Sequence, residues 1–255
     1  MSSAIKAIFV DMGGTLLTNE GKPYEVDGTD LNVKVLRELV ATGIPFNMLT
    51  GLPPELLRKA VLEPYLKLAT YVVLENGAAI YRRKGATLGF GFDHLDTDWH
   101  EKIRKASEGL DSIIDVLSRK NVAHQRFDYS VRVYDAKTQL AEGRAQELLS
   151  NLPEAIQVRL YRADMIFCPA LANKGEALRF IAAKECWKLS SMMAIGNEMI
   201  DESMLKIVGH PRATHNSPSE LKELVDKLGG EVSQSSAGEA VYEFLLSVLN
   251  RKLPV

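Results

Sequence analysis

The sequence predicts an α/β fold in which a doubly wound, mostly parallel sheet is interrupted by a smaller α+β domain. Short apolar runs alternate with helical patterns near both ends of the chain, and this order is typical of right-handed βαβ units. The middle of the chain instead combines amphipathic helices with alternating strands, which favours an antiparallel segment. We therefore expect a core of residues 1–82 and 170–255, with residues 83–169 inserted as a second domain.

Apolar runs in the first third of the chain predict buried strands over residues 5–10, 44–49 and 70–74. These runs are short and bounded by polar residues or glycine, as expected of strands that are covered on both faces of a parallel sheet. Helices are expected between them, over residues 31–41 and from Pro53 onward, because proline is tolerated in the first turn of a helix.

The pattern changes after the third strand. Glycine-rich or alternating stretches predict antiparallel strands, over residues 81–92, 130–134, 155–161 and 165–167. Helical patterns lie among them, over residues 96–117 and 140–149. Such half-exposed strands pack one face on helices and leave the other accessible, so we expect a cap that closes over the core.

The first pattern returns at Lys174. One further buried strand is expected over residues 191–195, and residues 208–214 are expected to be rich in loops. Helices are predicted over residues 176–183, 201–208, 217–228 and 237–249. These elements complete the second half of the core.

The composition is that of an ordinary globular protein. Of the 255 residues, 46% are hydrophobic and 25% charged, and the formal net charge is −2. Without a basic block or a bilayer-long apolar run, we expect no nucleic-acid or membrane partner. The N-terminus shows no signal peptide, and Cys168 and Cys186 stand in apolar surroundings typical of buried free thiols. A cytoplasmic protein is expected, and its oligomeric state is left open.

Residues with catalytic potential stand at four predicted strand ends. They are Asp11 with Thr15, Thr50 with Gly51, Lys174 with Gly175, and Asn197 with Asp201. Ligands of open α/β sheets bind beyond the carboxyl ends of the strands, so these residues are expected to meet at one edge. For Asp11 alone, an ordinary turn-forming aspartate is an equally good interpretation.

Five phrases occur in order along the chain: FVDMGGTL at residues 9–16, LTG at 49–51, ENGA at 75–78, NKGEAL at 173–178 and GNEMIDESML at 196–205. Together they resemble the haloacid-dehalogenase-like (HAD) hydrolase superfamily, and in particular its Cof-type, sugar-phosphatase-like branch. The resemblance covers nearly the whole chain. It implies a Rossmann-like core whose cap lies between the second and third motifs.

The resemblance assigns roles to these residues. Asp11 matches a nucleophile that forms an aspartyl-phosphate, which splits one difficult step into two easier ones. Lys174 matches the lysine that pairs with this nucleophile and with the phosphate. Thr50 and Gly51 match the phosphate-binding turn, and Thr15 is a further phosphate-binding candidate. The implied substrate is a small phosphorylated metabolite, such as a sugar phosphate.

A Mg²⁺ ion is also implied, and it would help to neutralise the attacked phosphate. The matching metal-site positions are Asp11, the backbone carbonyl of Gly13, Asn197 and Asp201. Asn197 stands where the family has an aspartate. Because an amide oxygen carries no charge, we expect this hard cation to be weakly bound.

Four positions depart from the family pattern. Gly13 replaces the aspartate that protonates the leaving oxygen and later activates water, a contribution of about 10²–10⁴ in rate. Asn197 replaces a carboxylate, Ile200 a phosphate-contacting asparagine, and Leu52 a residue that is often polar or basic. We therefore expect the geometry of the site to persist while phosphatase activity is reduced.

Three functions remain open. The first is a phosphatase of reduced activity that works through Asp11. The second is a pseudo-phosphatase that binds a phosphorylated ligand or partner without turnover. The third is dehalogenase- or phosphonatase-like chemistry, since those relatives also lack an acid at the position of Gly13. Their caps usually occupy a different insertion point, which disfavours the third.

Substrate contacts are expected from the cap. Its candidate residues are Arg126, Arg132, Arg159 and Arg162, although a solvated position is the commoner arrangement for any one of them. In the core, Glu75 and Asn76 either belong to the site or form a turn, and Asn216 is a weaker candidate.

Overall fold

The computed structural model describes residues 4–54, 57, 60–83, 92–94, 97–140, 148–150, 152–161 and 163–251. Within these ranges, eight strands form a large sheet in the order β14-β13-β12-β1-β4-β5-β6-β7. The strands are β1 (Ala7–Asp11), β4 (Phe46–Leu49), β5 (Ala69–Leu74), β6 (Ala79–Arg83), β7 (Phe92–His94), β12 (Met192–Gly196), β13 (His210–Ala213) and β14 (Glu231–Val232). Strands β14 to β5 pair in parallel, and β6 and β7 pair antiparallel at one edge. The predicted α/β class with a mostly parallel sheet is confirmed.

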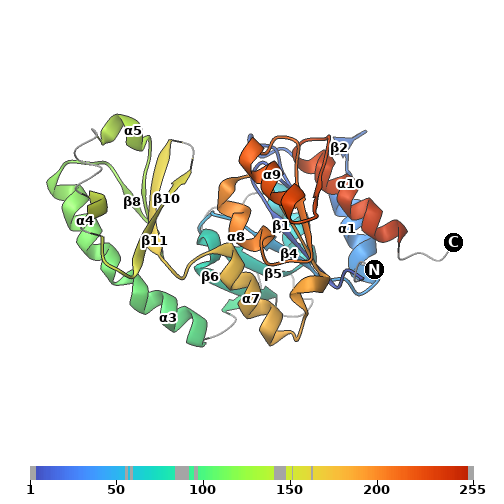
Figure 1. Ribbon diagram of the computed structural model, residues 1–255, viewed down its shortest axis with the longest axis horizontal. Coiled ribbons are helices and arrows are strands. Elements are labelled where there is room, and N and C mark those ends of the chain that lie inside the picture. The colour runs from blue at the N-terminus through green and yellow to red at the C-terminus, as the bar shows by residue number, and fades with distance from the viewer. Residues whose placement is uncertain are drawn as a thin grey trace.

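Strand β1 lies inside the sheet and is buried on both faces. Ile8 and Val10 pack into one hydrophobic cluster, and Ala7 and Phe9 pack into another on the opposite face. The first cluster includes residues of α1 (Leu31–Ala41), α2 (Glu63–Leu68) and α10 (Ala237–Asn250). The second includes residues of α7 (Lys174–Lys184), α8 (Glu202–Leu205) and α9 (Ser219–Lys227). Figure 1 shows α1 and α10, which contact each other, on one side of the sheet. Helices therefore cover both faces, as in a doubly wound fold.

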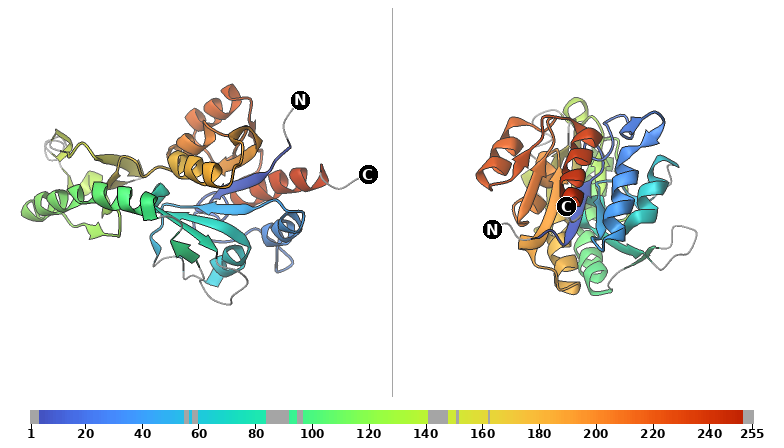
Figure 2. Two further views of the ribbon diagram at one scale, coloured as in Figure 1. Left: turned by 90° about the horizontal axis from the view of Figure 1, so that it is seen from below. Right: turned by 90° about the vertical axis from the view of Figure 1, so that its right-hand side faces the viewer.

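A second, antiparallel sheet has the strand order β10-β11-β9-β8. Its strands are β8 (Gln125–Arg126), β9 (Val131–Val133), β10 (Ile156–Tyr161) and β11 (Asp164–Pro169). It has a core of its own with α4 (Gly109–Arg119), and α3 (Thr97–Ser107) and α5 (Ala136–Gln139) lie nearby. Figure 1 shows this unit to the left of the large sheet, and Figure 2 shows α3 and α4 running in succession away from that sheet. We call these elements the cap.

Some predicted elements differ from the observed ones. The helix expected over residues 96–117 is two helices, α3 and α4, and most of the segment 140–149 lies outside the described residues. The antiparallel pair expected near residues 81–92 corresponds to β6 and β7, which extend the large sheet. The boundaries 1–82, 83–169 and 170–255 remain predictions.

Two expectations were wrong. Residues 208–214 contain β13, which is a parallel strand. The sequence predicted a loop there because His210, Pro211 and Arg212 lack an apolar pattern. Arg212 is nevertheless buried, with its guanidinium over the ring of Phe244. Cys168 is buried as expected, but Cys186 is exposed, in a turn after α7 where its φ is 55°. Among the described helices, none is long and apolar enough to cross a bilayer.

Candidate active site

The ammonium group of Lys174 joins two carboxylates at the carboxyl edge of the large sheet. Lys174 is the first residue of α7, a helix whose N-terminus is capped by the side chain of Asn173. Its Nζ donates to Oδ1 of Asp11 and to Oδ1 of Asp201, each at 2.5 Å. Lys174 is 1% exposed and Asp201 is 0% exposed, so these ion pairs are shielded from solvent. Three residues that are far apart in the sequence therefore form one charged cluster.

Asp201 is held by the backbone as well as by the lysine. Its Oδ2 accepts from the N–H groups of Asn197, at 2.9 Å, and Glu198, at 3.1 Å. Strand β12 ends at Gly196, where an added Cβ would lie 2.6 Å from the Cβ of Asp201, so only glycine allows this close approach. Both oxygens of Asp201 are thus engaged by protein donors. Its role as a metal ligand remains a prediction.

Burial shifts the pKa values of this cluster. Burial and the charge of Asp201 raise the pKa of Asp11 from 3.8 to about 7, although Lys174 opposes the shift. For Lys174, burial alone would lower the pKa, but the two carboxylates outweigh it and raise the pKa above its ordinary value. The lysine therefore stays charged at neutral pH. One ammonium charge is shared by two carboxyl groups, which favours keeping a proton on one of them.

The turn after β4 presents backbone and hydroxyl groups beside this cluster. The N–H of Thr50 donates to the carbonyl of Val73 at 2.8 Å, and its hydroxyl accepts from the N–H of Leu52 at 3.1 Å. Asn76 closes the other side, because its N–H donates to the carbonyl of Thr50 at 3.0 Å. A Cβ on Gly51 would lie 3.0 Å from Oδ1 of Asn76. Glycine therefore lets this turn pack closely against Asn76.

Thr15 and Asn197 lie next to Asp11, the candidate nucleophile, and both are almost completely buried. The Thr15 hydroxyl is 2.8 Å from the amide of Asn197. The turn that carries it contains Gly14, whose φ is 78° and where a Cβ would lie 2.5 Å from the Asn197 amide. Asn216 supports the same turn by donating to the carbonyl of Gly14 at 2.8 Å. The structure thus places Thr15 against Asn197, and a contact between Thr15 and phosphate remains a prediction.

A cavity of about 100 Å³ opens above Asp11, between the large sheet and the cap. From the core it is lined by Asp11, Met12, Gly13, Thr50, Gly51, Leu52, Asn76, Lys174, Glu198 and Ile200. From the cap it is lined by Arg132, Tyr161 and Ile166. Because sites for drug-sized ligands measure roughly 300–1,000 Å³, this cavity suits a short ligand.

Arg132 reaches the cavity because of its position in strand β9. Its neighbours Val131 and Val133 are fully buried in the cap core, so Arg132 points from the opposite face of the sheet. Its Nε donates to Oδ2 of Asp164 at 2.8 Å, and Nη2 also bonds to that oxygen. The guanidinium carbon lies 5.8 Å from the ring centroid of Tyr161. These contacts hold one guanidinium over the core.

The cap is anchored to the core by Glu75, which follows β5. Its carboxylate accepts from the Ser130 hydroxyl at 2.5 Å and from the Tyr129 N–H at 3.2 Å. Glu75 and the next residue, Asn76, both have positive φ, of 44° and 57°. This strained turn sends Glu75 to the cap and Asn76 to the cavity. The pair therefore forms a turn and also places Asn76 at the cavity, so the two interpretations that the sequence allowed are compatible.

The other predicted cap residues have different positions. Arg126 donates to the carbonyl of Ser130 at 3.4 Å, and Arg159 donates to that of Ala172 at 2.7 Å. Arg162 lies outside the described residues. Sequence reasoning missed Tyr161 and Ile166. Their contact with the cavity depends on which face of an antiparallel sheet meets the core, and the strand pattern alone does not specify this.

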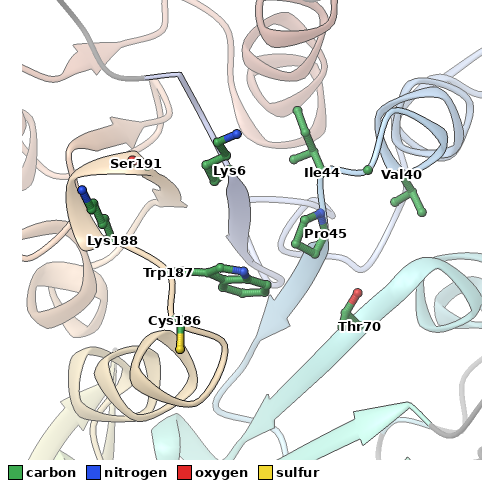
Figure 3. A pocket seen from close by; sticks show the side chains of 10 residues that line it. Lys6, Val40, Ile44, Pro45, Thr70, Cys186, Trp187, Lys188 and Ser191 are labelled. Carbon is green, nitrogen blue, oxygen red and sulfur yellow. The ribbon is translucent and has the colours of Figure 1, made fainter.

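A larger hollow, of about 780 Å³, lies at the opposite, amino edge of the sheet. Figure 3 shows Trp187 and Pro45 there, with Lys6 and Lys188 nearby. None of the described residues that line it is an acid or a histidine. Ligands of open α/β sheets bind at the carboxyl edge, and the chemistry-bearing residues also gather there.

The residues of the first cavity can hold a Mg²⁺ ion provided that the Asn197 amide turns its oxygen toward Asp11 and Gly13. Oδ2 of Asp11 and the carbonyl oxygen of Gly13 lie 3.2 and 3.0 Å from the same atom of the Asn197 amide, so they converge. Adjacent ligands of an octahedral Mg²⁺ with bonds of about 2.1 Å are about 3 Å apart. Oxygen donors of this kind suit a hard cation. Among the described residues, no three acids, histidines or cysteines cluster around a point, so the set carries little charge.

The fold and this site define a class of protein. A sequence model of the haloacid dehalogenase-like hydrolase family matches residues 8–127 and 94–245. The chain therefore belongs to that family, as its motifs predicted.

Two relatives of known name and one solved structure resemble this chain over nearly its whole length. The chain is 23% identical to the Bacillus subtilis 5-amino-6-(5-phospho-D-ribitylamino)uracil phosphatase YcsE, over 95% of this chain and 96% of the relative. It is 26% identical to the HMP-PP phosphatase of Serratia proteamaculans, over 93% and 94%. Among solved structures, the sucrose-phosphatase of Synechocystis sp. PCC6803 superposes with a TM-score of 0.72 at 16% identity, over 96% of this chain and 98% of the other. The predicted Cof-type branch is confirmed.

Proposed function

We propose that this protein hydrolyses small phosphomonoesters through an aspartyl-phosphate on Asp11. The observation that carries the proposal is the placement of Lys174 between Asp11 and Asp201, below a cavity that includes the Thr50–Gly51 turn. The relatives named above are phosphatases of small phosphorylated metabolites by their names, which supports this substrate class.

In the first step, a carboxylate oxygen of Asp11 attacks phosphorus while the bond from phosphorus to the leaving oxygen breaks. The electron pair of that bond goes to the leaving oxygen. Lys174 keeps its charge and stabilises the negative charge that gathers on the phosphoryl group. Water then attacks the phosphorus of the aspartyl-phosphate, which releases phosphate and restores Asp11.

Protonation of the leaving oxygen is the weak point of this site. Gly13 lines the cavity but has no side chain to deliver a proton. The proton must therefore come from water or from the substrate. Esters with good leaving groups need no acid, whereas alkyl esters lose general-acid assistance worth about 10²–10⁴ in rate. We therefore expect the rate ratio between these two ester classes to be larger here than at a site that has an acid.

A Mg²⁺ ion, when bound, would supply positive charge to the phosphoryl oxygens. Asp11, the carbonyl of Gly13 and the amide oxygen of Asn197 would hold it. In the cap, Arg132 and Tyr161 would contact the part of the substrate beyond the phosphate. The small cavity favours a short organic group there.

The test compares p-nitrophenyl phosphate and acetyl phosphate with glycerol phosphate, for the wild-type protein and for Asp11→Asn. Asp226→Asn, which changes an exposed residue on α9, is the matched control. We expect turnover of the first two compounds, an aryl ester and an acyl phosphate with good leaving groups, by the wild type and the control, and its loss in Asp11→Asn. Equal turnover by Asp11→Asn and the wild type would contradict the proposal.

A second candidate function is the binding of a phosphorylated ligand without turnover, and the bare backbone at Gly13 favours it. It predicts that phosphate esters raise the melting temperature of both the wild type and Asp11→Asn while neither shows turnover. Release of halide or cleavage of a carbon–phosphorus bond would instead support the dehalogenase- or phosphonatase-like alternative.

A further inference from the structure

The side-chain amide of Asn197 lies against two oxygens of the site, and both of its ends find hydrogen-bond partners when its nitrogen faces them. In the orientation that satisfies both of its ends, Nδ2 lies 3.2 Å from Oδ2 of Asp11, 3.0 Å from the carbonyl oxygen of Gly13 and 2.8 Å from the Thr15 hydroxyl oxygen. In the reverse orientation the amide oxygen would face two acceptors, with only the Thr15 hydroxyl to donate to it. Asn197 is 1% exposed, so little solvent is at hand to compensate for a mismatch.

The two oxygens that accept from this amide are also the ones that would hold a divalent cation. With nitrogen turned toward them, the N–H hydrogens point into the space of the cation. With oxygen turned toward them, the amide becomes a third ligand, but its hydrogen bonds to Asp11 and Gly13 are lost. Thr15 supports either arrangement, because a hydroxyl donates as well as accepts. Hydrogen bonding and cation binding therefore exclude each other at Asn197.

We propose that the Asn197 amide substitutes for a divalent cation, and that the site binds orthophosphate and phosphomonoesters without one. An aspartate at this position would put a second carboxylate about 3 Å from Asp11, and two such charges need a cation between them. The amide adds no charge and donates to the same oxygens. Lys174, already fixed between Asp11 and Asp201, is then the permanent positive charge of the site. The inference rests on the proposed function only for the class of ligand.

The test measures binding and stability, so it does not depend on turnover. The variants are Asn197→Asp, which adds a charge, and Asn197→Ala, which removes the donor without adding one. Asn47→Asp is the control for a buried asparagine elsewhere, since Asn47 lies in β4 and donates to the carbonyl of Ile8 at 3.0 Å. Melting temperatures are recorded with EDTA and with millimolar Mg²⁺, and Mg²⁺ and orthophosphate are titrated by calorimetry.

We expect the melting temperature of the wild type to be the same with EDTA and with Mg²⁺, and orthophosphate to bind in both. Asn197→Asp should be less stable in EDTA, regain stability with Mg²⁺, and bind Mg²⁺ about tenfold or more tightly than the wild type, which corresponds to about 1.4 kcal/mol or more. Asn197→Ala and Asn47→Asp should lose stability that Mg²⁺ does not restore. If Asn197→Asp folds only with Mg²⁺, the proposal is also supported.

Two results would overturn the inference. One is a wild-type affinity for Mg²⁺ equal to that of Asn197→Asp. The other is loss of orthophosphate binding to the wild type when EDTA is added. Neither depends on hydrolysis, so a protein that binds phosphate without turning over any ester would refute the proposed activity and leave this inference standing.

Discussion

The Ser130 hydroxyl donates a hydrogen bond of 2.5 Å to the carboxylate of Glu75, and this bond ties the cap to the large sheet. Glu75 lies at the end of β5, next to the cavity residue Asn76. Ser130 directly precedes β9, which carries Arg132. The position of Arg132 over the cavity therefore depends on an anchor only two residues away. Because Glu75 is 3% exposed, its ionisation should influence stability.

Stability is predicted to fall as pH rises through the titration of Glu75. Burial raises its pKa from 4.5 to about 7, against the opposing effect of bonds from Ser130 and Tyr129. Between these values the folded protein holds a proton that the unfolded chain releases. The contribution of Glu75 is thus complete below pH about 4.5 and lost as pH rises through about 7, a change on the order of 1–3 kcal/mol. Urea unfolding across this range measures it.

Glu75→Gln should remove this part of the pH dependence, and the exposed Glu63→Gln should leave it unchanged. Asp11 also has a raised pKa, so the informative quantity is the difference between the wild type and Glu75→Gln. Parallel stability profiles for those two proteins would contradict the prediction.

Gly13→Asp is predicted to increase the hydrolysis of alkyl phosphates. A Cβ at Gly13 would meet no atom within 4 Å, so the site has room for a side chain. A carboxyl group there could protonate the leaving oxygen, an effect worth about 10²–10⁴ in rate. Steady-state kinetics with glycerol phosphate and p-nitrophenyl phosphate measure it. The gain should be larger for the alkyl ester, and an equal effect on both esters would argue against an acid role.

Lys174→Met is predicted to destabilise the protein by about 3–5 kcal/mol at neutral pH, because it leaves two buried carboxylates without their cation. Lys206→Met is the matched control, since the side chain of Lys206 is 51% exposed and pairs with Glu202 one helical turn away. That pair is worth less than about 1 kcal/mol. Chemical denaturation of both variants provides the comparison. Adding Asp201→Asn to Lys174→Met should restore part of the stability, and no recovery would indicate that packing, rather than charge, explains the loss.

Arg132→Lys is predicted to weaken the binding of phosphomonoesters that carry a second anionic group. A lysine keeps the charge but cannot reproduce the bonds of the guanidinium to Asp164 while it faces a ligand. Hydrogen bonds to charged groups contribute about 1.5–3 kcal/mol, so the KM for 2-phosphoglycolate should rise by about tenfold or more. The KM for acetyl phosphate, which lacks that group, should change little. Arg119→Lys, on the exposed side of α4, is the control. The same shift for both substrates would refute a role in selecting the second group.

Much of the core could be predicted because its signals are local. The sequence of a strand that is buried on both faces is a short apolar run, and β1, β4, β5 and β12 all have such a sequence. Their carboxyl ends meet at one edge for any right-handed parallel arrangement. That rule was sufficient to predict that Asp11, Thr50 and Asn197 would gather there. Lys174 begins α7 and follows no strand of this sheet, so its place in the site was implied by the family resemblance alone. Strand β13 escaped prediction because a buried arginine and a proline leave no apolar period.

The cap residues of the site could not be predicted in the same way. Alternation in β9 shows that Arg132 and its two valine neighbours face opposite sides, but not which side meets the core. That choice depends on the docking of the cap, which the Glu75–Ser130 bond and the packing of Trp99 and Ile103 into the core cluster decide. Both contacts join residues far apart in the chain.

The sequence by itself determined the family, the order of the strand-ending residues and the loss of an acid at Gly13, because each is a property of neighbouring residues. Only the tertiary structure decided which cap residues face Asp11, how Lys174 is shared between two carboxylates, and which oxygens lie against the Asn197 amide. These depend on distances between segments that meet only in the folded chain. Hydrogen-bond donors and acceptors can be matched only where those distances are known.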